Sequence, residues 1–131
     1  MANDLIPFKE DGDRVTCTPS TAVVGKRLVS ISGDRNADGT YTIAPTGAAG
    51  KAFGVACWDA STTQKVTVIT VVSGNIVPIK GSGVIAAGDS VKPGAAGVVV
   101  AATAADRACG ICITGAVDGA DAMIQLAHHT A

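Results

Sequence analysis

The chain has 131 residues, the length of a single domain, and ten basic side chains nearly balance eleven acidic ones, for a formal net charge of −1. Aromatic residues make up 3% of the sequence, and no basic stripe accompanies them, which argues against a nucleic-acid partner. No stretch approaches the roughly 20 apolar residues of a membrane span, so no membrane partner is expected. Much of the 47% apolar content is alanine, so the core should be thin and completed by binding to other molecules.

The first thirteen residues differ from the rest of the chain. Leu5, Ile6 and Phe8 surround Pro7, and a charged stretch follows. Proline blocks a helix across this segment and favours extended backbone before it. We therefore expect an extended arm over residues 1–13, which either docks on another molecule or folds back on its own domain or a sister subunit.

Short β-branched runs bounded by turn residues fill the chain from residue 14 to residue 127, which predicts many short strands. The predicted strands cover residues 14–18, 26–32, 51–58, 65–73, 75–79, 90–92, 97–101, 108–114 and 122–127. Pro78 lacks an N–H, which places its strand at a sheet edge or a bend. No window shows a helical apolar stripe. The sequence thus predicts an all-β fold, a small single-domain β-barrel or β-sandwich with Gly/Pro-rich turns, followed by a tail over residues 128–131.

Two motifs suggest chemistry that their surroundings do not support. Residues 81–86 have the Gly-x-Gly-x-x-Ala spacing of a dinucleotide site, but the turn residues that follow leave no room for the required helix. Cys109 and Cys112 form a Cys-x-x-Cys within a predicted strand, where they point to opposite faces. Redox pairs need a helix N-terminus and structural zinc needs paired ligands. We interpret the four cysteines as small buried apolar residues and expect no metal and no cofactor.

The remaining polar residues do not form a catalytic set. The two histidines, His128 and His129, lie next to the end of the chain, and a nucleophile needs a base beside it. Nearly all the aspartates lie in turns, where they bond the backbone. Without a catalytic set, the protein is not expected to be an enzyme. Because its start has no signal-peptide pattern, it is expected to be made in a cytoplasm and kept reduced there.

Trp58 is the one tryptophan of the chain. It is either a packing residue at the end of its strand or an anchor in an interface, since tryptophan is enriched at binding hot spots. The sequence leaves both readings open, because it does not show which surface the side chain faces.

Four stretches in their order along the chain carry a family resemblance: "VVGKRLVSISGDR", "KAFGVA", "GNIVPI" and "AAGDSVKPGAAG". With them the sequence resembles the small capsid decoration (cement) proteins of tailed bacteriophages, especially phages of actinobacteria. The resemblance implies a non-enzymatic virion protein on the outer surface of an icosahedral head. It also implies the major capsid protein as partner, homotrimers at local three-fold positions, and capsid contacts by Leu5, Ile6, Pro7 and Phe8.

An alternative function stays open beside this one. A phage or cell-surface β-domain that binds a glycan or a host protein would have a similar composition, although the low aromatic content argues against a glycan cleft.

Overall fold

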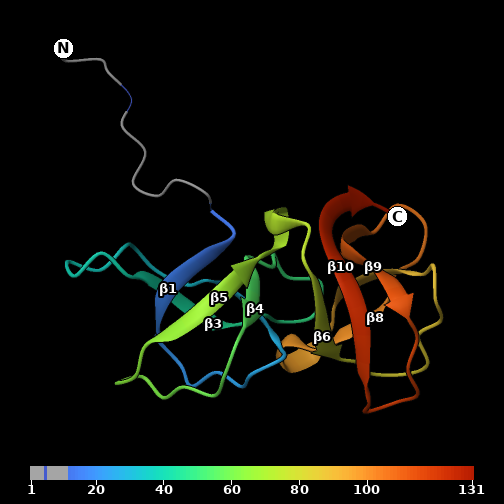
Figure 1. Ribbon diagram of the computed structural model, residues 1–131, viewed down its shortest axis with the longest axis horizontal. Coiled ribbons are helices and arrows are strands. Elements are labelled where there is room, and N and C mark those ends of the chain that lie inside the picture. The colour runs from blue at the N-terminus through green and yellow to red at the C-terminus, as the bar shows by residue number, and fades with distance from the viewer. Residues whose placement is uncertain (1–4, 6–11) are drawn as a thin grey trace.

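The computed structural model describes residue 5 and residues 12–131, and within this range the chain is all-β, as predicted. It forms two β units side by side, with strands β1–β5 in one and β6–β10 in the other (Figure 1). The first unit is a closed barrel with the strand order β1-β3-β2-β4-β5. Its strands are β1 (Arg14–Pro19), β2 (Leu28–Ile31), β3 (Tyr41–Pro45), β4 (Gly54–Ala56) and β5 (Val66–Thr70).

The second unit is a five-stranded antiparallel sheet with the order β6-β10-β9-β7-β8. Its strands are β6 (Ile76–Lys80), β7 (Ser90–Pro93), β8 (Val99–Ala101), β9 (Arg107–Thr114) and β10 (Asp121–Thr130). Two 3-10 turns complete the fold, η1 (Val71–Ser73) between β5 and β6 and η2 (Ala95–Gly97) between β7 and β8. Over the described residues, no helix is long and apolar enough to cross a membrane.

The fold has two buried clusters, one inside the barrel and one between the two units. One fills the barrel with residues such as Val29, Ile43 and Val68. The other lies between the barrel and the second sheet, and barrel residue Leu28 joins Leu126 of β10 there. Neighbouring residues of β2 therefore enter different clusters, because successive side chains of a strand point to opposite faces. This double burial explains why the sequence around β2 shows no simple alternation.

Two glycines allow close approaches that a side chain would block. A Cβ at Gly54 would collide with the carbonyl oxygen of Ile69 and with the Val68 side chain, inside the β4–β5 pair. Gly97 ends η2 with φ of 80°, and a Cβ there would meet the carbonyl oxygen of Leu28. Only glycine adopts that backbone geometry readily, so Gly97 lets the second unit contact strand β2 directly.

The structure agrees with most of the predicted strands and differs at particular places. Strand β6 with Pro78 lies at a sheet edge, as expected. The run predicted over residues 65–73 ends early, because residues 71–73 turn into η1. Strand β3 was not predicted. Strand β10 continues to Thr130 rather than ending at residue 127, so the residues expected to form a tail are mostly strand.

Candidate docking surfaces

The residues expected to contact a partner fall mostly outside the described part of the chain. Ile6, Pro7 and Phe8 lie outside the described residues. Leu5 is described, and it is 88% exposed. The capsid contacts implied for these four residues stay a prediction.

Trp58 follows β4 and is 49% exposed. Its indole Nε1–H donates a hydrogen bond to the carbonyl oxygen of Lys65 over 3.1 Å. The next residue, Asp59, accepts a hydrogen bond from the Gly25 N–H over 2.8 Å. The ring is thus held in one orientation with about half of its surface open, and its role as an interface anchor stays a prediction.

Three of the four cysteines have the environment of apolar residues. Cys17, Cys109 and Cys112 are buried, but Cys57, which was expected to be buried too, is exposed, because it lies just after the end of the short strand β4. Burial raises the pKa of Cys17 and of Cys109 to about 12, and it also raises the pKa of Cys112, with a further contribution from the charge of Asp89. Cys109 and Cys112 both belong to the cluster between the units, so the prediction that they point to opposite faces is wrong. The pairing of β9 with β10 shifts register between Leu126 and His129, which breaks the simple alternation there. Thiols that stay protonated are poor nucleophiles and poor metal ligands.

Both histidines are residues of strand β10, and each interacts with neighbouring groups. The ring of His129 lies 2.9 Å from the Ser90 hydroxyl through Nε2 and 3.1 Å from the Ala127 carbonyl oxygen through Nδ1. Burial lowers the pKa of His128, and the charge of Arg107 adds to this effect. Within the described range, no group of three or more His, Cys, Asp and Glu side chains is placed to hold a metal ion.

Asp106 and Asp38 accept hydrogen bonds within turns, as the sequence predicts. Asp106 accepts hydrogen bonds from Lys92 Nζ over 2.8 Å and from the Thr103 N–H and hydroxyl over 2.9 and 2.8 Å. These donors, Lys92 first, lower the pKa of Asp106 to about 2. Asp38 is held in the same way by Thr40 and has a pKa of about 2 as well. Both groups stay ionised and engaged with their neighbours, which suits a structural role.

Exposed apolar side chains gather on the outer face of the second sheet, over three neighbouring strands. We call this surface the apolar sheet face; it consists of Ile76, Pro78, Ile111, Ile113 and Met123. The strand register brings its members together, since Met123 pairs with Pro78, and Gln125 pairs with both Ile76 and Ile111. Exposed apolar side chains gathered on one sheet face are typical of interaction sites. The sequence analysis did not predict the apolar sheet face. The alternation in "AMIQLA" was the available signal, because it places Met123 on the opposite face of the strand from the buried Ile124.

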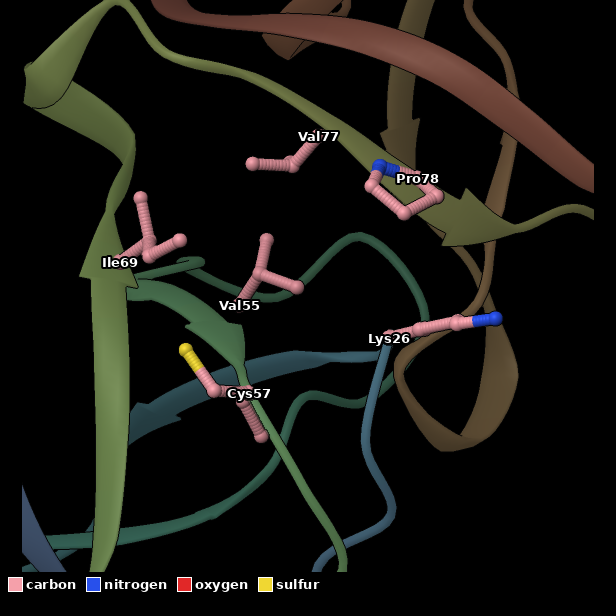
Figure 2. A pocket seen from close by; sticks show the side chains of 7 residues that line it. Lys26, Val55, Cys57, Ile69, Val77 and Pro78 are labelled. Carbon is pink, nitrogen blue, oxygen red and sulfur yellow. The ribbon is translucent and has the colours of Figure 1, made fainter.

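A second apolar feature is a hollow of about 210 Å³ where the barrel meets β6 (Figure 2). Val55, Ile69 and Val77 form its aliphatic walls, while Lys26 lies at the rim. The ammonium group of Lys26 forms an ion pair with Asp121 at 3.0 Å. Burial raises the pKa of the Cys57 thiol on the wall. The hollow therefore offers space for an apolar side chain, beside a thiol that burial keeps protonated.

A third feature lies where the chain enters strand β1. We call it the aromatic groove; it has a volume of about 350 Å³ and is lined by Gly12, Val15, Tyr41, Ala52, Phe53, Thr70, Val72 and His128. The rings of Tyr41 and Phe53 lie with their centroids 6.4 Å apart. Val72, on η1, is 75% exposed. The groove is thus mostly apolar and open to solvent.

Comparison with known proteins gives a match in fold. No protein-family model matches the sequence, and no curated protein does. Among solved structures, the fold is similar to that of the head fiber gp8.5 N base in bacteriophage phi29. The TM-score is 0.74 at 17% sequence identity, and the match covers 90% of this chain and 96% of that chain. At this identity the likeness establishes the all-β fold across almost the whole chain.

Proposed function

We propose that the chain is a structural protein of a bacteriophage virion, which binds the outer surface of an icosahedral head and stabilises the assembled capsid. The observation that carries the proposal is the fold shared with a phage head fiber protein over nearly the full length of both chains. The sequence resemblance to capsid decoration proteins points in the same direction. In this role the protein is not an enzyme and needs no cofactor.

The contact with the shell, in this proposal, is made by the apolar sheet face and by the segment from Leu5 to Phe8. The sheet face is apolar, exposed and built on paired strands, so binding costs little ordering of the chain. The partner is the major capsid protein. Three copies of the chain gather around each local three-fold position, where capsid subunits meet.

Stabilisation follows from binding to one state of the shell. A ligand that binds only the assembled lattice stabilises it by RT ln(1 + [L]/Kd), about 2.7 kcal/mol per site when the free protein is at a hundredfold excess over Kd. Because each head has many equivalent sites, a modest energy per site sums to a large resistance against rupture.

The test is to add the purified full chain to heads assembled without it and to image them by electron cryomicroscopy. Added density outside the shell at repeated positions is expected, together with a higher temperature of DNA release. Met123→Asp should weaken binding, because it puts a charge in the apolar sheet face. Val24→Asp is the matched control, since Val24 and Met123 are both 46% exposed but Val24 lies outside the face. Heads that stay bare at saturating protein would refute the proposal.

The fold comparison also favours a second candidate, a base on the head surface that carries a fiber. A decoration protein should appear as compact density at every equivalent position. A fiber base should instead occupy its positions beneath a projecting shaft made of further chain or another protein. The same images of heads distinguish these two arrangements.

A further inference from the structure

The aromatic groove begins at the residue where the N-terminal segment leaves the fold. Gly12 forms part of its wall, and the Thr70 hydroxyl donates a hydrogen bond to the Gly12 carbonyl oxygen. The backbone N–H of Thr70 also donates to the Asp13 carbonyl oxygen over 2.9 Å. These bonds fix the exit of the segment at the end of strand β5, so whatever precedes Gly12 starts beside the groove.

The groove has the surface that an aromatic side chain needs. Tyr41 and Phe53 supply two tilted rings, and Val72 is an apolar side chain left largely in water. Aromatic rings prefer tilted or offset neighbours at centroid distances of about 4.5–7 Å. A third ring that packed against Phe53 and covered Val72 would remove apolar surface from water on both sides.

The chain itself carries such a ring within reach. Phe8 precedes Gly12 by four residues, and four extended residues span at most about 13–14 Å. A short tether of this kind gives an effective concentration in the millimolar range. Leu5 is described and is 88% exposed, so its side chain is not covered by the domain. We propose that, in the protein free in solution, the aromatic groove binds Phe8 of the same chain while Leu5 remains outside.

Charge supports the same occupant. Glu10 and Asp11 stand between Phe8 and Gly12, so a docked segment places two carboxylates at the rim of the groove. His128 lines the groove and also lines a neighbouring hollow with Arg107, whose charge acts on it. Arg107 is exposed and provides the positive charge that the acidic pair would face. Such a pair at the surface adds specificity more than affinity.

This inference concerns the free protein and stands independently of the proposed function. Its consequence is that a partner that binds the segment must first compete with the groove. Docking on the parent domain would also keep an apolar segment from random association before a partner is met.

The experiment uses the full chain labelled with 4-fluorophenylalanine and observed by ¹⁹F NMR. The chain has two phenylalanines, so Phe8→Leu identifies both signals. Docking predicts that the Phe8 signal loses most of its solvent isotope shift between H₂O and D₂O, and that the Phe53 signal moves in Phe8→Leu. Val72→Asp should return the Phe8 signal to the position of an exposed ring, and Arg107→Glu should move it part of the way. Val24→Asp is the control and should leave both signals unchanged.

Two further readings complete the test. A far-ultraviolet circular dichroism spectrum like that of the wild type shows that Val72→Asp still folds. If it does not fold, Arg107→Glu alone decides, because it alters a surface charge. The Phe8 signal should not change on dilution, since the docking is within one chain. A Phe8 signal with the full isotope shift of an exposed ring would overturn the inference. A Phe8 signal that responds to neither Val72→Asp nor Arg107→Glu would also overturn it. So would a Phe8 ring that becomes exposed on dilution, because this would indicate docking on a second copy.

Discussion

Replacing Leu28 with alanine should destabilise both β units at once. Leu28 belongs to barrel strand β2, yet its fully buried side chain enters the cluster between the barrel and the second sheet. Truncating a buried leucine removes transfer free energy and leaves a cavity, which together cost about 2–5 kcal/mol. Domains are stable by only about 5–15 kcal/mol. At about 4 °C per kcal/mol for a chain of this length, the melting temperature should fall by about 8–20 °C.

The assay follows unfolding with two probes. Fluorescence of Trp58, the one tryptophan, reports on the barrel, and far-ultraviolet circular dichroism reports on all strands. Coincident transitions indicate one cooperative unit. Leu126→Ala is the matched variant, because Leu126 enters the same cluster from β10 and is equally buried; it should shift both probes as well. Val72→Ala, at an exposed site, should change stability by no more than about 0.5 kcal/mol.

Separate transitions for the two probes would contradict this coupling between the units. If Leu28→Ala lowered the fluorescence transition while the circular dichroism kept a second transition at the original temperature, the barrel and the second sheet would be independent. The shared cluster would then not be what couples them.

Three further predictions follow from single sites. Asp106 has a folded-state pKa of about 2 against an ordinary 3.8, so its contribution to stability is present above about pH 4 and is lost as the pH falls through about 2. In Asp106→Asn, the urea midpoint should therefore decline less over this pH interval than in the wild type. The same dependence of the midpoint on pH in both proteins would contradict the assignment. Gly54→Ala should cost about 1–3 kcal/mol or more by overpacking the β4–β5 pair, measured by chemical denaturation; wild-type stability would show that the strands can separate without cost. A thiol reagent should modify Cys57 well before Cys109, because the latter is buried with a pKa of about 12; mass spectrometry of the labelled peptides checks the order, and the reverse order would mean that the buried cluster opens readily.

Much of the fold could be predicted because local chemistry determines it. Runs of β-branched residues between glycine, proline and aspartate are strands in the structure, and Pro78 lies at an edge because it cannot donate to a central ladder. Three of the four thiols are buried as expected, whereas Cys57 is exposed. The aspartates that lie in turns, such as Asp106, also bond as expected.

What could not be predicted depends on contacts between distant segments. Strand β3 is short and flanked by loop residues, and it is paired in parallel with β1, with Thr18 opposite Thr42. No local pattern encodes that pairing. The apolar sheet face is also invisible in the sequence, because Ile76, Ile111 and Met123 become neighbours only through the order β6-β10-β9. The strand that contains the histidines is a similar case. Pairing with β9 holds β10 in the sheet up to Thr130, and because this pairing is tertiary, the sequence alone predicts a tail there.

The free edge of β6 is poorly suited to accept another strand. The Leu126 N–H donates to the Asn75 carbonyl oxygen, so alternation along β6 turns the backbone of residues 76, 78 and 80 away from β10. Pro78 has no N–H to offer there. The N–H of Lys80 already donates to the Lys26 carbonyl oxygen over 3.0 Å. Prolines and occupied donors at an edge prevent strand addition between molecules.

The edge at β8 is partly engaged as well, and the barrel has none, which affects how the domain can bind. At β8, the Ser82 N–H donates to the Val99 carbonyl oxygen over 2.9 Å, and Gly81 bridges the same residue. The barrel has no free edge because its strands close on themselves. These contacts disfavour strand addition, so over the described residues we expect a partner to be recognised by side chains rather than by strand pairing. A charge at Met123 should then weaken binding to a head while leaving every ladder of the sheet intact, which separates a docking surface from a structural one.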